Sequence, residues 1–399
     1  MKRSVRLQHH TSQDRFTEAD ARQLLCLLRE HESLSAREIE RRLQLPRSRS
    51  LPAMQLLRKK GLLAGPQLGQ SRGRATHFRL NRSCAHVIGV DIGGTNLRVV
   101  LADMSGATLG RWTTSTGGAC SPAAVIQKIK EGVQHLLRST STPRASLLAV
   151  AAGVPGITDA KAGVVIMTSY LGGWRNVPFH ALLKSSLHVP VAIENDVRMA
   201  AIGENWRGAA KGVADFVFLA IGTGIAAGIF VNGQILHGTE SIAGEVGYMF
   251  VPGTSVAAVE RGAPGALESA IGGEGIKERW QLARNSDAGA DSGNLNATEI
   301  FDRGAKGDPA ARKVLEEAAQ ILAYAIYDIS LLLNCRLFVL GGGVGANASL
   351  RDATQHVLEK YSEPVKPKLT LSSLGQEAQL FGAIRLALDR ADSRILAGA

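Results

Sequence analysis

The chain has 399 residues, of which 45% are hydrophobic and 20% charged, a balance typical of two or three globular units with substantial cores. No apolar run approaches the roughly 18 residues of a membrane helix, and the basic N-terminus lacks the apolar stretch of a secretory signal, so we expect no membrane partner. Four cysteines without CxxC spacing predict a reducing, cytoplasmic location and argue against a disulfide framework and a cysteine-rich metal site.

The net charge of +11 is confined to the beginning of the chain. Residues 1–82 hold 18 of the 46 Lys and Arg residues and 7 of the 35 Asp and Glu residues, so the remainder is neutral. Because this asymmetry coincides with a helical pattern, it favours a polyanionic partner over a solvated basic face.

Residues 1–14 are interpreted as a flexible arm, and residues 15–82 as three short helices followed by a basic hairpin. Ser35 with Glu38 is a capping-box signature for the second helix, and Gly61 is placed to end the third. This order predicts a winged helix-turn-helix that binds double-stranded DNA, with a helical dimerisation module as the alternative. The residues expected to contact DNA lie at the start of the third helix and at the hairpin tip: Arg47, Ser48, Arg49, Ser50, Arg72 and Arg74.

Pro52 lies inside the third helix, where a proline removes one backbone hydrogen bond. We therefore expect the regular helix to begin near Leu51, which would place Pro52 in its first turn.

From Ala85 onward strands and helices alternate, and three glycine-rich segments follow apolar strands. Adjacent glycines let backbone amides approach a phosphate, and Asp91 can orient a magnesium ion, although an ordinary hairpin turn is the alternative for the first segment. Long helices are expected at about residues 123–137, 309–333 and 376–388. The predicted nucleotide- and phosphate-binding residues are Asp91, Gly93, Gly94, Thr95, Gly222, Thr223, Gly224, Gly341, Gly342 and Gly343.

These glycine segments, together with Asn195-Asp196 and the run from Ala243 to Tyr248, resemble the ROK family (repressors, open reading frames and sugar kinases) over roughly residues 85–388. The resemblance implies an α/β, two-lobed actin-like ATPase fold of the ribonuclease H-like type for residues 83–399. Lobe one would take about residues 83–197 and a C-terminal helix at 376–390, and lobe two about residues 198–375. The basic segment resembles the winged helix-turn-helix of the family's xylose and N-acetylglucosamine repressors.

The resemblance also assigns sugar-site residues. In the family's kinases the residue that matches Asp196 is the catalytic general base on a sugar hydroxyl, and the residue that matches Asn195 binds the sugar. For both residues the pattern alone leaves a helix N-cap as the other role. Further sugar contacts are implied for Glu245, Tyr248 and Glu268.

A structural zinc site of the family is missing from this chain. The family usually has a histidine and three cysteines where this chain has Tyr248, Val259, Arg261 and Ala266. Zinc needs about four nitrogen or sulfur ligands, so we predict no zinc.

The sequence favours a sugar-responsive transcriptional regulator that binds operator DNA as a homodimer, takes a sugar or sugar phosphate as effector and needs no cofactor for DNA binding. The alternative is an ATP-dependent sugar kinase that uses Mg²⁺ and has Asp196 as general base. We expect weak or no kinase activity, because Tyr248 and the lost thiolates leave the sugar loop less well fixed. An inactive scaffold is a third reading, but it does not explain the intact phosphate turns.

Overall fold

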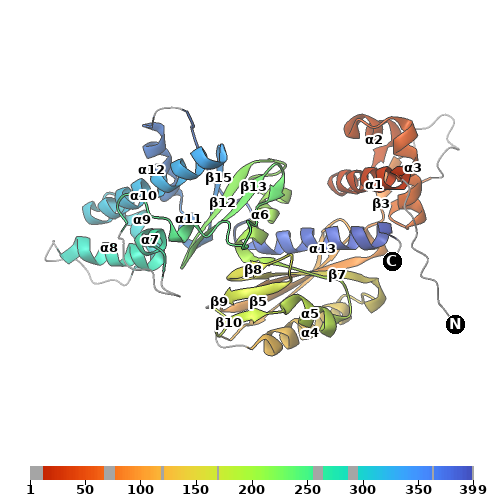
Figure 1. Ribbon diagram of the computed structural model, residues 1–399, viewed down its shortest axis with the longest axis horizontal. Coiled ribbons are helices and arrows are strands. Elements are labelled where there is room, and N and C mark those ends of the chain that lie inside the picture. Colours follow the sequence, from red (N-terminus) through yellow and green to blue (C-terminus); the bar gives the residue numbers. More distant parts are fainter. Residues whose placement is uncertain are drawn as a thin grey trace.

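The protein is described by a computed structural model over residues 12–66, 77–117, 121–168, 170–254, 264–285, 295–361 and 364–397. Figure 1 shows an N-terminal module above one end of the long helix α13 (Ala378–Ala397), a first lobe whose sheet lies beneath that helix, and a second lobe beyond its other end. Within these ranges no helix has the length and apolar character that a membrane span requires.

The N-terminal module consists of three helices and a small sheet of order β1-β3-β2. Its core is formed by leucines such as Leu24, Leu28 and Leu57, which are fully buried. The capping box predicted at Ser35 is present, with the Ser35 amide 2.8 Å from the Glu38 carboxylate, and Gly61 adopts the expected positive φ of 75°. The elements are α1 Ser12–Glu30, β1 Leu34–Ser35, α2 Ala36–Leu43, α3 Arg47–Lys59, β2 Leu63–Ala64 and β3 His77–Leu80.

The expected start of the third helix was wrong. Helix α3 begins at Arg47 rather than near Leu51, and Pro52 lies inside it, in the second turn. The first turn closes without Pro52, because the amides of Arg49 and Ser50 both donate to the carbonyl of Pro46. Pro52 therefore deprives only the carbonyl of Ser48 of its usual helical donor.

Lobe one is built on a five-stranded sheet of order β11-β7-β4-β5-β6, covered by α13 on one face and by α4 and α5 on the other (Figure 1). Alternate residues of β4 point to opposite cores: Val87 lies in the core that contains α13, and Ile88 in the core that contains α4 and α5. The strands are β4 His86–Ile92, β5 Asn96–Asp103, β6 Thr108–Ser115, β7 Leu147–Val154 and β11 Val191–Asn195, with a smaller sheet of β8 Ile157–Asp159, β9 Val164–Thr168 and β10 Trp174–Val177. The helices of lobe one are α4 Pro122–Ser139 and α5 Phe179–Leu187, and α6 Asp196–Arg207 follows β11 and buries Ala200 and Ala201 in the core of lobe two.

Lobe two has a second five-stranded sheet, of order β14-β13-β12-β15-β16, with its helices gathered at the far end of the molecule (Figure 1). Its longest helix, α10, covers the predicted range 309–333. The strands are β12 Phe216–Ile221, β13 Ile225–Val231, β14 Gln234–Ile235, β15 Leu337–Gly341 and β16 Lys368–Leu371. The helices are α7 Ala266–Ile271, α8 Gly273–Asn285, α9 Ala297–Ala305, α10 Pro309–Leu333, α11 Gly342–Gly345 and α12 Ala348–Glu359.

Helix α13 connects the parts of the molecule. It packs closely on α6, because Gly203 and Gly382 face each other's helix and a Cβ on either glycine would overlap the opposite backbone. The helix continues to Ala397, beyond the expected end near Leu388, and its last turns contact the N-terminal module. There Asp392 receives both terminal nitrogens of Arg29 at 2.7 Å, and both side chains are buried.

Candidate functional site

The first glycine turn joins β4 and β5 as a tight hairpin, as predicted. The amide of Gly93 donates to the carbonyl of Asn96 at 2.8 Å, and the Gly93 carbonyl accepts the hydroxyl of Thr116 at 2.7 Å. A Cβ placed on Gly94 would have three atoms of Tyr170 as its nearest neighbours in the described part of the chain, the closest being the Tyr170 Cβ at 3.5 Å. The turn thus faces the loop between β9 and β10.

The second and third glycine segments come together in lobe two. Gly222, Thr223 and Gly343 line one cavity of about 480 Å³, together with side chains from α8 and the start of α9. Gly342 has a φ of 82° and lies against the backbone of Ile221, so no other residue fits this position without strain. Gly224 does not belong to the lining of this cavity, and neither does any residue of the first glycine turn.

Asp91 is engaged by an arginine. Its carboxylate accepts hydrogen bonds from Nε and Nη2 of Arg98 at 2.9 and 2.7 Å. The same guanidinium also donates to the carbonyl of Gln376, at the approach to α13. Burial raises the pKa of Asp91 above its ordinary value, while the charge and hydrogen bonds of Arg98 oppose that rise. A magnesium ion at this position would have to share the carboxylate with Arg98.

Asn195 and Asp196 stand where β11 passes into α6. Asn195 is the N-cap of α6: its side-chain oxygen accepts the amide of Arg198 at 2.9 Å, and its Nδ2 donates to the carbonyl of Gly156 and to Asp196. The cap role left open by the sequence is therefore real for Asn195. Asp196 is the first residue of the helix and its Oδ1 accepts the amide of Val197 at 2.9 Å.

The environment of Asp196 is unusual for a carboxyl group. Burial raises the pKa of Asp196 to about 7, the negative charge of Asp91 adds to the rise, and the hydrogen bond from the Val197 amide opposes it. A carboxyl with a pKa near 7 can exchange a proton with a ligand at neutral pH, which is the property of a general acid or base.

Tyr170, which the sequence analysis did not single out, bridges the two lobes. Its ring packs on Gly94 of lobe one, and a Cβ placed on Gly224 of lobe two would lie 3.1 Å from its hydroxyl. Tyr170 is 45% exposed, and its partial burial raises the pKa of its hydroxyl, which the charges of Glu268, Asp196 and Glu245 raise further. A Cβ placed on Gly224 would also lie 3.1 Å from Oε2 of Glu268, so this carboxylate lies beside the same hydroxyl, and Asp196 and Glu245 are near enough for their charges to act on it. We call the group the interlobe site; it comprises Asp91, Tyr170, Asp196, Glu245, Tyr248 and Glu268.

Three of the predicted sugar residues, Glu245, Tyr248 and Glu268, lie in lobe two. Glu268, on α7, accepts the amide of Ile225 at 2.9 Å. Burial raises the pKa of Glu245, the positive charge of Arg198 opposes the rise, and Glu268 adds to it. Tyr248 is 44% exposed. Of the residues at the missing zinc positions, Ala266 is buried at the start of α7, while Val259 and Arg261 lie outside the described residues.

A second group of residues missed by the sequence analysis supports α6. Glu194 is buried and accepts hydrogen bonds from His237 at 2.7 Å and from the amide of Asn195, with Arg198 Nε at 3.2 Å. Arg198 Nη2 also donates to the carbonyls of Thr158 and Ser241. A local signal was present, because charged residues are dense at the end of this strand, in the run Glu194-Asn195-Asp196-Val197-Arg198. The hydrogen-bond partners Thr158 and His237, however, lie more than 30 residues away in the sequence.

Of the four predicted DNA-contacting residues at the start of α3, three are exposed and one is buried. Arg47 and Ser48 are exposed at the start of α3. Arg49 is about half exposed and pairs with Asp20 of α1 at 2.6 Å. Ser50 is buried and donates to Glu40 at 3.1 Å, so it faces the core of the module. Arg72 and Arg74 lie outside the described residues.

Comparisons with known proteins identify relatives of two kinds. The chain is 29% identical over 310 residues to a glucokinase from Halalkalibacterium halodurans, an alignment that covers 74% of this chain and 92% of the relative. It is 21% identical over 354 residues to a xylose repressor from Caldicellulosiruptor bescii, covering 83% of this chain and 85% of the relative. Repressors and sugar kinases are thus both among its relatives.

A solved structure extends the likeness to nearly the whole chain. A ROK family transcriptional regulator, a homologue of the E. coli MLC protein, superposes with a TM-score of 0.81 at 19% sequence identity, covering 96% of this chain and 98% of that one. This likeness confirms the predicted fold, a two-lobed α/β actin-like ATPase fold behind an N-terminal module. The model of the ROK family matches residues 87–390, and the chain therefore belongs to the ROK family.

Proposed function

We propose that this protein is a sugar-responsive transcriptional regulator. Residues 15–82 form a winged helix-turn-helix that binds operator DNA, and residues 83–399 bind a sugar or sugar phosphate between their two lobes. The observation that carries the proposal is the basic N-terminal segment: residues 1–82 hold the whole +11 excess of charge, and Arg47 and Ser48 are exposed at the start of α3. Phosphate neutralisation by such residues supplies most of the affinity for a duplex.

The interlobe site supplies groups that suit a sugar. Carboxylates accept hydrogen bonds from hydroxyls, and the charges of Asp196, Glu245 and Glu268 all act on Tyr170. We assign sugar contacts to these three residues, to Tyr248 and to the remaining hydrogen-bonding capacity of Asn195. No cofactor is needed for this role.

Tyr170 favours the regulator over the kinase. In a kinase of this fold the glycine turns of both lobes would hold the phosphates of ATP, and here the ring of Tyr170 lies against Gly94 while its hydroxyl approaches Gly224. The ring thus occupies space that a phosphate held by both turns would need. Arg98 also competes with Mg²⁺ for the carboxylate of Asp91.

The second candidate function is an ATP-dependent sugar kinase, and the pKa of Asp196 near 7 favours it. Asp196 would accept the proton of the attacking sugar hydroxyl. The cavity at Gly222, Thr223 and Gly343 would hold the nucleoside, with the glycine turns at Gly93 and Gly224 toward the phosphates and Mg²⁺ at Asp91.

We further propose that the regulator is a cytoplasmic homodimer. A helix-turn-helix protein usually reads two half-sites about one helical turn apart through a twofold axis. Light scattering of the protein with duplex DNA tests this, and a monomeric mass would contradict it.

The proposal is tested with Arg47→Glu in the full-length protein. Reversing this charge should weaken binding to duplex DNA and lower the slope of log affinity against log salt by roughly one, as expected for one lost phosphate contact. The matched control is Arg138→Glu, which makes the same charge change at an exposed position of α4. Equal DNA binding by wild type and Arg47→Glu, or no duplex binding by wild type at low salt, would overturn the proposed role of the module.

A further inference from the structure

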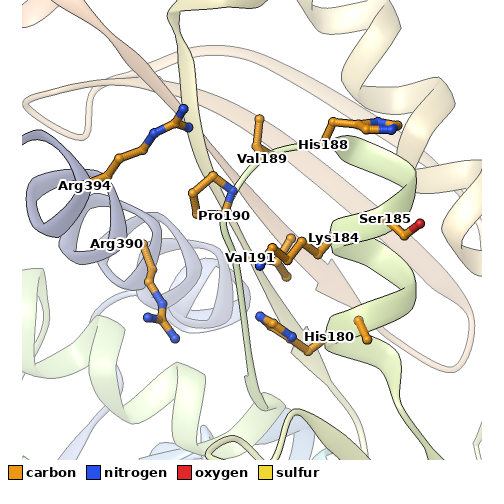
Figure 2. Close-up of a pocket in the computed structure, with 10 residues that line it drawn as sticks. His180, Lys184, Ser185, His188, Val189, Pro190, Val191, Arg390 and Arg394 are labelled. Carbon is orange, nitrogen blue, oxygen red and sulfur yellow. The ribbon is translucent and has the colours of Figure 1, made fainter. Parts of the chain in front are cut away.

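A cavity of about 950 Å³ lies on the outer side of lobe one, away from the interlobe site. Three segments line it: α5, the start of β11 and the last turns of α13. Figure 2 shows His180 and Lys184 extending from α5 on one side of the strand, and Arg390 and Arg394 extending from α13 on the other. The lining residues are His180, Ala181, Lys184, Ser185, His188, Val189, Pro190, Val191, Arg390 and Arg394.

The charges of this cavity all have one sign. Lys184, Arg390 and Arg394 contribute three cations, and no acidic residue belongs to the lining. In the parts of the chain that the structure describes, neither Lys184 nor Arg390 forms an ion pair, and Arg394 makes only a long contact of 3.4 Å to the carbonyl of Leu148. Acidic neighbours on α13 are engaged elsewhere, since Asp389 pairs with Arg385 and Asp392 with Arg29.

The cations repel one another within the cavity. The pKa of His180 is lowered first by burial and then by the positive charges of Lys184 and Arg390, so these two groups act on the same ring from opposite walls. Residues 83–399 are neutral as a whole, so a group of cations without an acid is a local feature rather than a general property of this domain. An anion bound among them would relieve the repulsion.

We propose that this cavity binds a small organic phosphate. The guanidinium groups of Arg390 and Arg394 and the ammonium of Lys184 would hold the phosphate, because Arg recognises phosphate oxygens with two parallel hydrogen bonds. Ala181, Val189, Pro190 and Val191 supply an apolar wall for the rest of the molecule. The site is an open groove whose volume lies within the range of roughly 300–1,000 Å³ that is usual for small-molecule sites.

Such a ligand would bind next to the residues of α13 that contact the N-terminal module. Arg390 and Arg394 lie on the same turns of α13 as Asp392 and Ser393, which receive hydrogen bonds from Arg29 and Arg22 of α1. The site is separate from the interlobe site, so it does not depend on which sugar binds there or on whether phosphate is transferred there.

The test is calorimetric titration of the full-length protein with inorganic pyrophosphate and with ribose 5-phosphate, using ribose as the unphosphorylated match. Wild type should bind both phosphates, and the double variant Lys184→Glu/Arg390→Glu should bind them roughly tenfold or more weakly, since two charge-assisted contacts become repulsive. The control Lys313→Glu changes an exposed charge on α10 and should bind as wild type does. Both substituted side chains of the double variant are exposed, and Lys184→Gln/Arg390→Gln gives a milder second variant if the first is poorly folded.

Several outcomes would overturn the proposal. One is that neither phosphate saturates wild type at millimolar concentration, and another is that ribose binds as tightly as ribose 5-phosphate. Equal binding by wild type and both double variants would place the phosphate at the N-terminal module or the interlobe site instead. If the double variants lose affinity for duplex DNA while wild type binds no small phosphate, the cavity contributes to the DNA surface.

Discussion

At the scale of single residues, the charge of Asp196 should govern stability near neutral pH. Its pKa of about 7 exceeds the ordinary value of 3.8, so the native state binds the proton more tightly than the unfolded chain does. The resulting stability is fully present below about pH 4 and is lost as the pH rises through 7. Above pH 7 the native protein carries a poorly solvated charge that Asn would not have.

We therefore expect Asp196→Asn to be more stable than wild type at about pH 8, by roughly 1–3 kcal/mol, and nearly equal to it at about pH 4. Thermal melts across this pH range measure the difference. A gap between the two proteins that does not change with pH would contradict the raised pKa. If the protein is a kinase, the same variant should also lose turnover by roughly 10²-fold or more, as general-base loss requires.

Tyr170 gives a second prediction at this scale. Because its side chain lies against Gly94 and close to Gly224, Tyr170→Ala should make room between the two turns. Binding of a non-hydrolysable ATP analogue should strengthen by roughly tenfold, or about 1.4 kcal/mol. Tyr248→Ala is the matched control, since Tyr248 belongs to the same site but is not a nearest neighbour of either glycine. Unchanged nucleotide affinity in Tyr170→Ala would remove Tyr170 as an argument against the kinase.

The sequence pattern could indicate which short segments matter but not which partners they meet. Asn195, Asp196 and the glycine turns stand out because their spacing is local. Arg98 reaches the carbonyl of Gln376 across 278 positions, and Glu194 meets His237 across 43, so no local pattern could reveal either contact. Tyr170 was missed for the same reason, because its importance arises only where two lobes approach.

At the scale of elements, Pro52 is the clearest conflict between local preference and structure. It occupies the second turn of α3 and leaves the carbonyl of Ser48 without its helical donor. Pro52→Ala should restore that hydrogen bond, which stabilises the folded protein. It should also give the unfolded chain more conformational freedom, which destabilises the protein by less. We therefore expect a net stabilisation of about 1–2 kcal/mol. Chemical denaturation measures it, with Ser35→Ala as a reference expected to lose about 1 kcal/mol of capping. A destabilised Pro52→Ala protein would show that α3 needs the proline for its packing.

Elements were predictable where a local signal marked their ends. The capping box at Ser35, the glycine hairpins and the bounds of α10 follow from residues within a few positions. The end of α13 could not be predicted from nearby residues, because its last turns are stabilised by the N-terminal module. Ala391 and Leu396 are buried there. From the sequence alone Asp392 would be expected to face solvent, but it is the partner of Arg29.

At the scale of the whole molecule, α13 reaches from the interlobe site to the N-terminal module. Near its start Arg98 binds both Asp91 and the carbonyl of Gln376, and near its end Asp392 binds Arg29. The core of the N-terminal module is continuous with the core beneath α13, since Leu28 and Leu388 belong to one cluster. A rigid element with a contact at each end can carry the effect of one ligand on the other, provided that the two ligands favour different positions of it.

This arrangement predicts that the Arg29–Asp392 pair couples sugar to DNA. Arg29→Met alone would leave a buried carboxylate unpaired and should cost about 3–5 kcal/mol, whereas replacing both partners with apolar residues is often nearly neutral. We therefore expect Arg29→Met/Asp392→Leu to fold and to keep its sugar affinity, because the interlobe site lies at the other end of α13.

The change in DNA affinity on adding the effector sugar should shrink toward one in this double variant, from the roughly 5–150-fold that allosteric proteins commonly show. The measurement is DNA affinity with and without sugar, for wild type, for the double variant and for Arg351→Met/Asp352→Leu, which removes a more exposed ion pair in lobe two. A wild-type sugar response in Arg29→Met/Asp392→Leu would show that the signal bypasses this contact. The remaining routes would then be the hydrogen bond from Arg22 to Ser393 and the apolar surface between α1 and α13, where Leu24 and Leu388 are buried in one core.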